Sequence, residues 1–306
     1  MRKAFAETLT KIAIDNSRLA FVTGDLGFQV FDDFVNKCGP RYINAGVAEA
    51  QMIYTAAGMA IEGWQTIAYS IASFATARPF EQIRFCVDYP KLPVVLVGAG
   101  RGYTYATSGV SHHAADDIAL MSALPNMTVV IPGDPGEIEQ LLPQLVALKA
   151  PGYFTVGRFG EPRFEAEEPA TLGKARRIRS GSKIAVISTG EIINEVLAAA
   201  DVLRKESITP HIYQMHTVKP LDTHALNNLS GEVRAFLIVD EHLPNGGLWS
   251  AIASWSVLSG QHARLIRLGP PDRYALGNMQ RDDLREKLEY DRTAIIKKCR
   301  EIWKTL

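Results

Sequence analysis

The stretch TIAYSIASFATARPFEQIRFCVDYPKLPVVLV, residues 66–97, decides the fold class of this chain. It begins with an apolar strand at 66–71, continues through a segment of helical spacing at 74–87, and ends in a second apolar strand at 92–97. Strands joined by a helix pair side by side in a parallel sheet, which helices then cover on both faces. The stretch therefore predicts an α/β fold.

The same alternation of strands and helices continues in both directions. Further strands are expected at 19–22, 127–131, 153–156, 183–188, 210–214, 235–240 and 264–268. Further helices are expected at 2–16, 48–61, 115–124, 135–148, 191–204, 222–229, 247–259 and beyond 281. A charged, Pro-containing stretch at 161–170 interrupts the pattern. We therefore expect two consecutive three-layer α/β/α domains with mostly parallel sheets, at 1–175 and 176–306.

Composition limits the partners and the compartment. The chain has 306 residues, with 33 Lys and Arg against 33 Asp and Glu, so no net charge attracts nucleic acid or an anionic membrane. A hydrophobic content of 47% excludes a disordered chain. Cys38, Cys86 and Cys299 lie far apart and include no CxxC pair, so we expect neither disulfides nor a metal site. No segment is apolar enough for a membrane span or a signal peptide, which favours a cytoplasmic protein.

Common nucleotide and hydrolase motifs are missing. The sequence has no GxGxxG after a strand, no GxxxxGK[ST] and no GxSxG. Basic residues do not alternate with aromatic ones along a stripe, which disfavours a nucleic-acid groove. Because an α/β fold supports many chemistries, function has to be argued from a site.

Two segments place reactive side chains at helix starts. NAGVAEAQM, 44–52, puts Glu49 at the beginning of a helix, where complementing the helix dipole also explains an acid. YSIASFATARPFEQ, 69–82, puts Phe74, Arg78 and Phe80 where a strand passes into a helix. Ligands commonly bind at such places in parallel sheets, although a phenylalanine there can also be part of the core.

A third segment, GAGRGYTYATSGVSHH at 98–113, is a long glycine-rich loop that ends in His112 and His113. Loops of this length in a compact domain usually have a function. A fourth, NMTVVIPGDP at 126–135, is interpreted as structural, being a strand that runs into a turn. Five histidines of the second half show no metal-ligand spacing and are also interpreted as structural: His211, His216, His224, His242 and His262.

Together these segments resemble the C-terminal half of transketolase. The resemblance to its pyrimidine-binding domain is carried, in order, by Gly-Val-Ala-Glu at 46–49, Ser-Phe-Ala at 73–75, Ser-His-His at 111–113 and Pro-Asn-Met-Thr-Val-Val-Ile-Pro-Gly-Asp at 125–134. Val-Lys-Pro-Leu-Asp at 218–222, Asp-Glu-His at 240–242 and Gly-Gly-Leu at 246–248 resemble its C-terminal domain. Deoxyxylulose phosphate synthase and the β subunits of 2-oxo acid dehydrogenases share the pattern less closely.

The resemblance implies thiamine diphosphate as cofactor. It implies that Glu49 hydrogen-bonds the pyrimidine ring nitrogen from a dry pocket and supports the proton transfer that activates the cofactor. Phe74 matches the aromatic residue that stacks on the aminopyrimidine. Phe80 is the alternative, because the local spacing is uncertain by one residue. Asp25 matches an acid near the cofactor.

The resemblance also implies a set of substrate contacts. His112 matches the loop histidine that faces the hydroxyls of the substrate, and His113 is an extra histidine beside it. Arg158 and Arg2 match arginines that hold the phosphate of the substrate, for which a guanidinium is better suited than an ammonium. We expect Arg78 to contact the substrate as well. Ser108 stands where the family loop commonly carries an aspartate, and the insert at 101–105 adds aromatic surface nearby, so the sugars can differ from the usual pentose phosphates.

No segment matches the part of a complete transketolase that binds the diphosphate through Mg²⁺. The resemblance therefore implies a split transketolase, in which a larger N-terminal subunit supplies the diphosphate and metal site. A homodimer of this chain within a heterotetramer is the expected assembly.

The expected function is transfer of a two-carbon glycolaldehyde unit from a ketose phosphate to an aldose. One alternative is a β subunit of a 2-oxo acid dehydrogenase or of another acyl-transferring thiamine enzyme. An alternative of another class is a non-catalytic partner that stabilises or regulates a thiamine enzyme.

Overall fold

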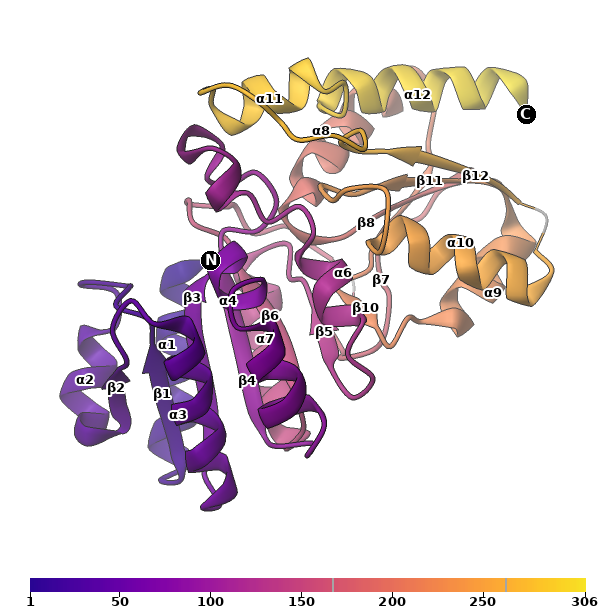
Figure 1. The fold of residues 1–306 in the computed structure, drawn as a ribbon. Helices are drawn as coiled ribbons and strands as arrows, with labels where there is room; N and C mark the ends of the chain where they lie inside the picture. Colours follow the sequence, from indigo (N-terminus) through magenta and orange to yellow (C-terminus); the bar gives the residue numbers. More distant parts are fainter. Residues whose placement is uncertain (167, 262) are drawn as a thin grey trace.

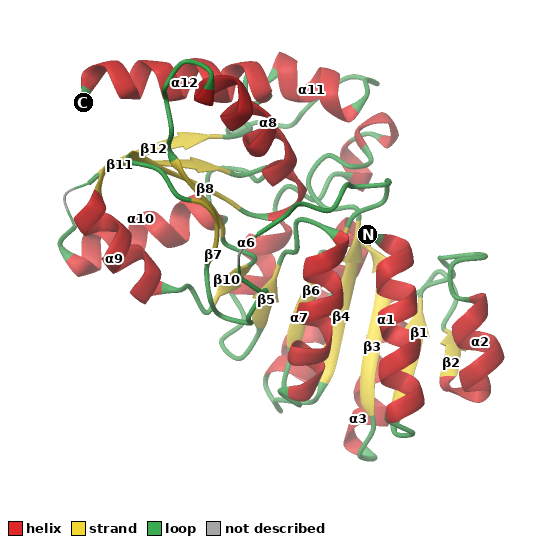
Figure 2. Cartoon of the chain, turned by 180° about the vertical axis from the view of Figure 1, so that it is seen from behind, coloured by secondary structure: helices red, strands yellow, loops and turns green. Residues whose placement is uncertain are grey.

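The computed structural model describes residues 1–166, 168–261 and 263–306. It contains two mostly parallel sheets with helices on their faces, as Figures 1 and 2 show. This confirms the predicted α/β fold. The larger sheet is built mainly by the first half of the chain and the smaller sheet by the second half.

Over the described residues, the larger sheet has seven strands. Their order is β10 (Thr217–Lys219), β5 (Thr128–Val130), β6 (Gly152–Val156), β4 (Val94–Ala99), β3 (Gln65–Ile71), β1 (Leu19–Thr23) and β2 (Tyr42–Asn44). All neighbours are parallel except β10 and β5. The strand β10 comes from the second half of the chain, so the division near residue 175 stays a prediction.

The two faces of this sheet carry different helices because successive side chains of a strand point to opposite faces. Phe21 and Tyr69 pack in one apolar cluster, with residues of three helices: α1 (Arg2–Asp15), α2 (Asp32–Cys38) and α7 (Pro135–Ala147). Val22 and Ala68 pack in another, with residues of α3 (Glu49–Ile61) and α6 (Asp117–Ser122).

The smaller sheet has five strands, in the order β12 (Arg264–Leu268), β11 (Val233–Val239), β8 (Lys183–Ser188), β9 (His211–Gln214) and β7 (Arg176–Arg179). Only β7 and β9 pair antiparallel. The helices that flank this sheet are α8 (Ile193–Arg204), α9 (Thr223–Glu232), α10 (Leu248–Ser259), α11 (Arg281–Lys287) and α12 (Arg292–Thr305).

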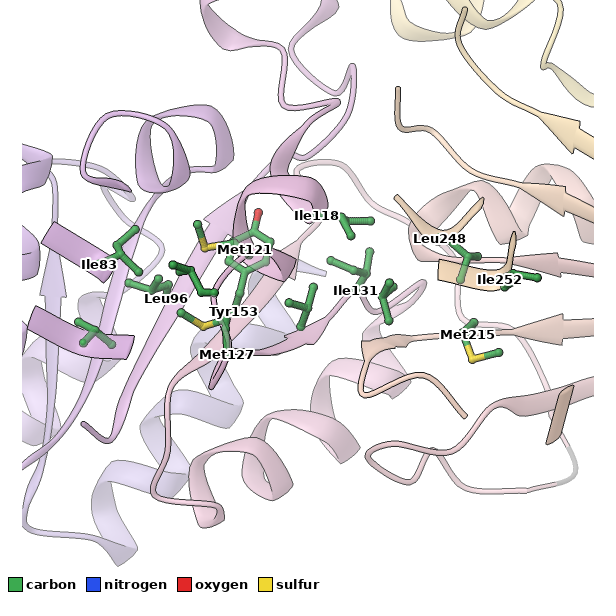
Figure 3. Packing of buried hydrophobic residues seen from close by; sticks show 14 of the residues in the cluster. Ile83, Leu96, Ile118, Met121, Met127, Ile131, Tyr153, Met215, Leu248 and Ile252 are labelled. Atoms are coloured by element: carbon green, nitrogen blue, oxygen red, sulfur yellow. The ribbon is translucent and has the colours of Figure 1, made fainter. Parts of the chain in front are cut away.

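One apolar cluster joins the two halves of the molecule. Figure 3 shows Leu96, Met121 and Tyr153 of the first half in the same cluster as Met215 and Ile252 of the second. The two sheets therefore share a core and are held in a fixed relation to each other.

The helix predicted over 74–87 is wrong as a single element. The structure has a short helix α4 (Ala72–Thr76), a break, a turn of helix α5 (Phe80–Gln82) and a π-helix (Ile83–Asp88). Pro79 explains the break, because proline has no backbone N–H to donate within a helix.

Candidate active site

The carboxyl ends of the parallel strands bring the predicted segments to one edge of the larger sheet. Phe74 follows β3, the glycine-rich loop follows β4, and Arg158 follows β6. This edge is where ligands bind in open parallel sheets.

Glu49 begins α3, with Ala48 at the N-cap position. Only 6% of its side chain is exposed, and both carboxylate oxygens accept hydrogen bonds from Nη1 of Arg78, at 3.0 and 3.2 Å. The arginine is half exposed, so the pair joins a buried carboxylate to a side chain at the surface.

Phe74 lies beside this ion pair. The guanidinium carbon of Arg78 is 3.7 Å from the centroid of the Phe74 ring. Arg78 therefore stacks on Phe74 and hydrogen-bonds Glu49 at the same time. Although the sequence suggested a substrate contact for Arg78, the structure places it against these two residues.

The two candidate aromatic residues differ in their surroundings. Phe80 begins α5, packs against the large apolar cluster and lies under the guanidinium of Arg84, at 4.9 Å. Phe74 instead contacts Glu49's partner on one side and a histidine of the glycine-rich loop on the other. Phe74 therefore lies next to both Arg78 and His112, whereas Phe80 packs against the apolar cluster.

That histidine is His112, whose ring centroid is 4.9 Å from the Phe74 ring in an edge-on arrangement. Its Nδ1 is 3.0 Å from the hydroxyl of Ser111, which leaves Nε2 as the nitrogen for other partners. The Ser73 hydroxyl donates to the carbonyl of Ser111 at 3.2 Å and so ties the loop to α4.

His113 points elsewhere. Its ring is 4.9 Å from that of Tyr103, and Nε2 is 3.4 Å from the carbonyl of Ala106. Burial lowers the pKa of His113 below the usual value for histidine. Ser108 is exposed, at the end of a short 3-10 helix. The structure thus brings His112 to Phe74 but not His113 or Ser108.

Arg158 lies at the far side of the loop. Its guanidinium carbon is 4.6 Å from the centroid of Tyr105 and 5.4 Å from that of Phe159. Arg158 and Arg2 both line a cavity of about 720 Å³ between α1 and the start of α2. Both predicted phosphate contacts therefore line one cavity.

Tyr105 connects the two ends of the site, and the sequence suggested only that it adds aromatic surface. Its ring is 6.1 Å from that of His112 and supports Arg158 on the other side. Gly100 leaves room for the Tyr105 ring, because a Cβ on residue 100 would lie 2.3 Å from Cε2 of Tyr105. That requirement for glycine is a signal in the sequence, but only the structure shows which side chain needs the space.

Six side chains thus form one continuous series, which we call the site row: Glu49, Arg78, Phe74, His112, Tyr105 and Arg158. A carboxylate lies at one end and an arginine beside a cavity at the other. Asp25 follows β1 and accepts a hydrogen bond from Nδ2 of Asn44 at 2.8 Å, away from these contacts.

Within the described ranges, no three His, Cys, Asp or Glu side chains come together in a way that would hold a metal ion. His262 lies outside the described residues. Across those same ranges, none of the helices is both long and apolar enough to span a membrane.

Comparisons with known proteins agree on one family. Residues 1–158 match the model of the transketolase pyrimidine binding domain, and residues 173–295 match that of the transketolase C-terminal domain. The chain is 34% identical over 305 residues to a putative transketolase C-terminal section of Methanocaldococcus jannaschii, which covers 98% of this chain and 95% of that protein. It is 29% identical over 274 residues to a subunit of an apulose-4-phosphate transketolase from Phocaeicola vulgatus, covering 89% of this chain and 87% of the relative.

Among solved structures, the chain resembles one described as a split gene transketolase, inactive beta4 tetramer. The TM-score is 0.89 at 26% identity, and the match covers 99% of this chain and 98% of the other.

Proposed function

This chain belongs to the transketolase family, and we propose that it is the smaller subunit of a split transketolase that transfers a glycolaldehyde unit from a ketose phosphate to an aldose. Relatives that it spans over most of their length are themselves described as a section or a subunit of a transketolase. Together with a larger subunit, the chain would form the complete enzyme.

The observation that carries the proposal is the order of groups in the site row. A buried carboxylate at Glu49, a stacked ring at Phe74 and a histidine at His112 follow one another within contact distance. The series ends at Arg158, beside the cavity that Arg2 also lines. This order suits a cofactor at the Glu49 end and a phosphorylated substrate at the Arg158 end.

The residues present fit the pyrimidine of thiamine diphosphate, the cofactor of this family. The guanidinium of Arg78 is flat, stacks on Phe74 and hydrogen-bonds Glu49, and these are the contacts that a flat nitrogen heterocycle would make there. Phe74 would hold the ring by stacking and Glu49 would hydrogen-bond its edge, once Arg78 turns away. When bound, the cofactor supplies the carbon nucleophile that accepts the two-carbon unit.

The chain's own residues then have separate roles. Glu49 would hydrogen-bond the edge of the cofactor ring with its carboxyl group, from a position where only 6% of the side chain is exposed. His112, with Nδ1 facing Ser111, presents Nε2 to a hydroxyl of the sugar and exchanges a proton with it. Arg158 and Arg2 bind the phosphate, since guanidinium groups donate paired hydrogen bonds to its oxygens.

The partner would provide the remainder of the site. We propose that a larger subunit binds the diphosphate through Mg²⁺ and that two copies of this chain associate with two copies of it. The similar structure described as an inactive tetramer of β chains supports the idea that chains of this kind need a partner for activity.

The test is reconstitution with the larger subunit encoded by a neighbouring gene. The chain alone, the partner alone and the mixture are given thiamine diphosphate, Mg²⁺ and a ketose phosphate, and glycolaldehyde transfer to an aldose is measured. Activity in the mixture alone is the expected result. Turnover of a 2-oxo acid with a lipoyl acceptor instead would favour the acyl-transferring alternative. Cofactor binding with neither activity would favour a non-catalytic partner.

A further inference from the structure

A buried carboxylate of the second half contacts the loop that carries His112. The Glu241 side chain follows β11 and is fully buried. Its Oε1 accepts a hydrogen bond from the backbone N–H of Tyr103 at 3.0 Å. The same carboxylate accepts from Nε of Arg281 at 2.9 Å and from Nε of Arg285 at 2.6 Å.

The loop is shaped to reach this carboxylate. Gly102 has φ +58°, and a Cβ there would lie 2.4 Å from Oε1 of Glu241. Glycine is therefore needed both for the backbone conformation and for the close approach. In addition, the N–H of Leu243 donates to the carbonyl of Ala115 at 2.8 Å, so the segment after β11 contacts the loop at both of its ends.

The two ends of the loop are also paired with each other. Gly102 and Ala114 exchange two backbone hydrogen bonds, at 3.0 and 2.8 Å, and form an isolated antiparallel bridge. Residues 102–114 are thus a closed hairpin-like loop, which we call the histidine loop. Its base rests on the second half of the chain, and its tip presents His112 to Phe74.

The base is fixed by charge as well as by shape. Arg281 and Arg285 lower the pKa of Glu241 well below the usual value for a carboxyl, so it is ionised at neutral pH. Arg281 also donates to Glu191 at 2.8 Å. Removing the charge of Glu241 would take one carboxylate from each of the two arginines, which keep Glu191 and Asp282 as partners.

The tip has a weaker connection to the first half. In the described part of the chain, its polar contact with α4 is one hydrogen bond, from Ser73 to the carbonyl of Ser111, and His112 adds a ring contact with Phe74. The polar contacts at the base are therefore more numerous than those at the tip.

We propose that Glu241 is a positioning residue, which fixes the base of the histidine loop and thereby holds His112 in register with Phe74 and Tyr105. Its effect on catalysis rests on the function proposed above, whereas its effect on the loop does not. The second half of the chain would then take part in ordering the active site in addition to packing against the first half.

The test uses two variants that act from opposite sides of the contact. Glu241→Gln keeps the size of the side chain and removes its charge, and Gly102→Ala adds a Cβ on the loop side while leaving Glu241, Arg281 and Arg285 unchanged. The matched control is Asp222→Asn, another buried carboxylate of the second half, which caps α9 and accepts from the N–H of Ala175.

Hydrogen exchange of the full chain measures directly how well the amides of the histidine loop are protected. We expect amides of 102–106 to exchange about tenfold faster or more in both variants, with amides of β11 protected as in the wild type. In the control, the loop should exchange as in the wild type. Unchanged loop exchange in both variants, or equal loss of protection across β11, would overturn the proposal.

The kinetics of the reconstituted enzyme measure the effect of the loop position on catalysis. We expect kcat to fall by about 10- to 100-fold in both variants, because small displacements of a catalytic group have effects of this size. The fraction of enzyme that binds thiamine diphosphate should stay unchanged, since Glu49 and Phe74 lie on other elements. A merely structural role would lower this fraction together with kcat, and would contradict the proposal. If the wild type shows no transfer, the proposed function fails, and the exchange experiment still decides whether Glu241 fixes the loop.

Discussion

Arg78 donates hydrogen bonds to both carboxylate oxygens of Glu49, at 3.0 and 3.2 Å, although the two side chains differ greatly in exposure. About half of the Arg78 side chain is exposed, against 6% for Glu49. Because Arg78 is half exposed, water competes for its guanidinium and weakens the pair. A ligand that makes stronger contacts with Glu49 and Phe74 can therefore displace the arginine.

Replacing Arg78 tests two effects separately, one on the binding of the cofactor and one on the KM for the sugar. Arg78→Ala should lower the Kd of the reconstituted enzyme for thiamine diphosphate by up to about fivefold, because the cofactor no longer competes with the guanidinium. A simultaneous rise in KM for the sugar would support the substrate contact predicted from the sequence. The matched control is Arg84→Ala, which removes a guanidinium from over Phe80 and should leave both constants unchanged. Weaker cofactor binding in Arg78→Ala would show that Arg78 contacts the bound cofactor, instead of occupying its site when the cofactor is absent.

Glu49→Gln should keep the shape of the site and remove the carboxyl group, which an amide cannot replace in proton transfer. We expect kcat to fall by about 100-fold or more, as for the loss of a general acid or base. The thermal unfolding midpoint should change little, since the ion pair with Arg78 is weak. Glu62→Gln, at the exposed end of the same helix, is the control and should retain full activity. A Glu49→Gln enzyme with more than a tenth of the wild-type kcat would contradict the role given to Glu49.

Arg158→Lys should weaken binding of the phosphate while keeping the charge. A lysine lacks the planar, paired donors of a guanidinium and stacks less well on Tyr105. We expect KM for a ketose phosphate to rise about tenfold, with the KM for the unphosphorylated ketose unchanged. Arg163→Lys is the control, because that exposed arginine pairs with Glu139 instead. An equal rise in KM for both ketoses would place the phosphate elsewhere.

His216 should make the fold sensitive to acid. It is fully buried, its Nε2 has no hydrogen-bond partner among the described residues, and burial lowers its pKa to about 3. The unfolded chain, with a histidine pKa of about 6.5, binds more protons between these values, so stability falls as the pH falls below about 6.5. Between pH 7 and pH 5 the loss due to this residue is about 2 kcal/mol.

Thermal unfolding of His216→Gln at the two pH values checks this. The midpoint of the variant should drop less on acidification than that of the wild type, by a few degrees. His224→Gln, on the exposed side of α9, should behave as the wild type does. If acidification lowers the unfolding midpoint equally in His216→Gln and in the wild type, His216 is not the cause of the loss of stability.

The periodicity of the sequence predicts the strands that build the centres of both sheets, because buried parallel strands are continuous apolar runs. It does not reveal β10, whose three residues Thr217–Lys219 are too few and too polar for such a signal. That strand pairs with β5 only because the chain returns to the first sheet, which depends on tertiary contacts. The π-helix after Phe80 is likewise absent from a pattern that was interpreted as one continuous helix.

The candidate site was predictable in its residue types more than in its contacts. Resemblance to a family indicates Glu49, Phe74, His112 and Arg158 as members, and geometry then puts these four in one row. Adjacent histidines in a sequence give no hint that they face opposite ways, because the backbone of a short 3-10 turn decides this. Glu241 lies 138 residues along the chain from the amide that it binds, so its contact with the loop has no local signature.

We propose that this chain holds one half of a thiamine diphosphate site. Calorimetric titration of thiamine diphosphate with Mg²⁺ into the isolated chain, the larger subunit and their mixture tests it most directly. We expect stoichiometric binding, one cofactor per copy of this chain, in the mixture, and no such binding by the chain alone. Stoichiometric binding by the isolated chain would contradict it, because the diphosphate site would then lie within this chain.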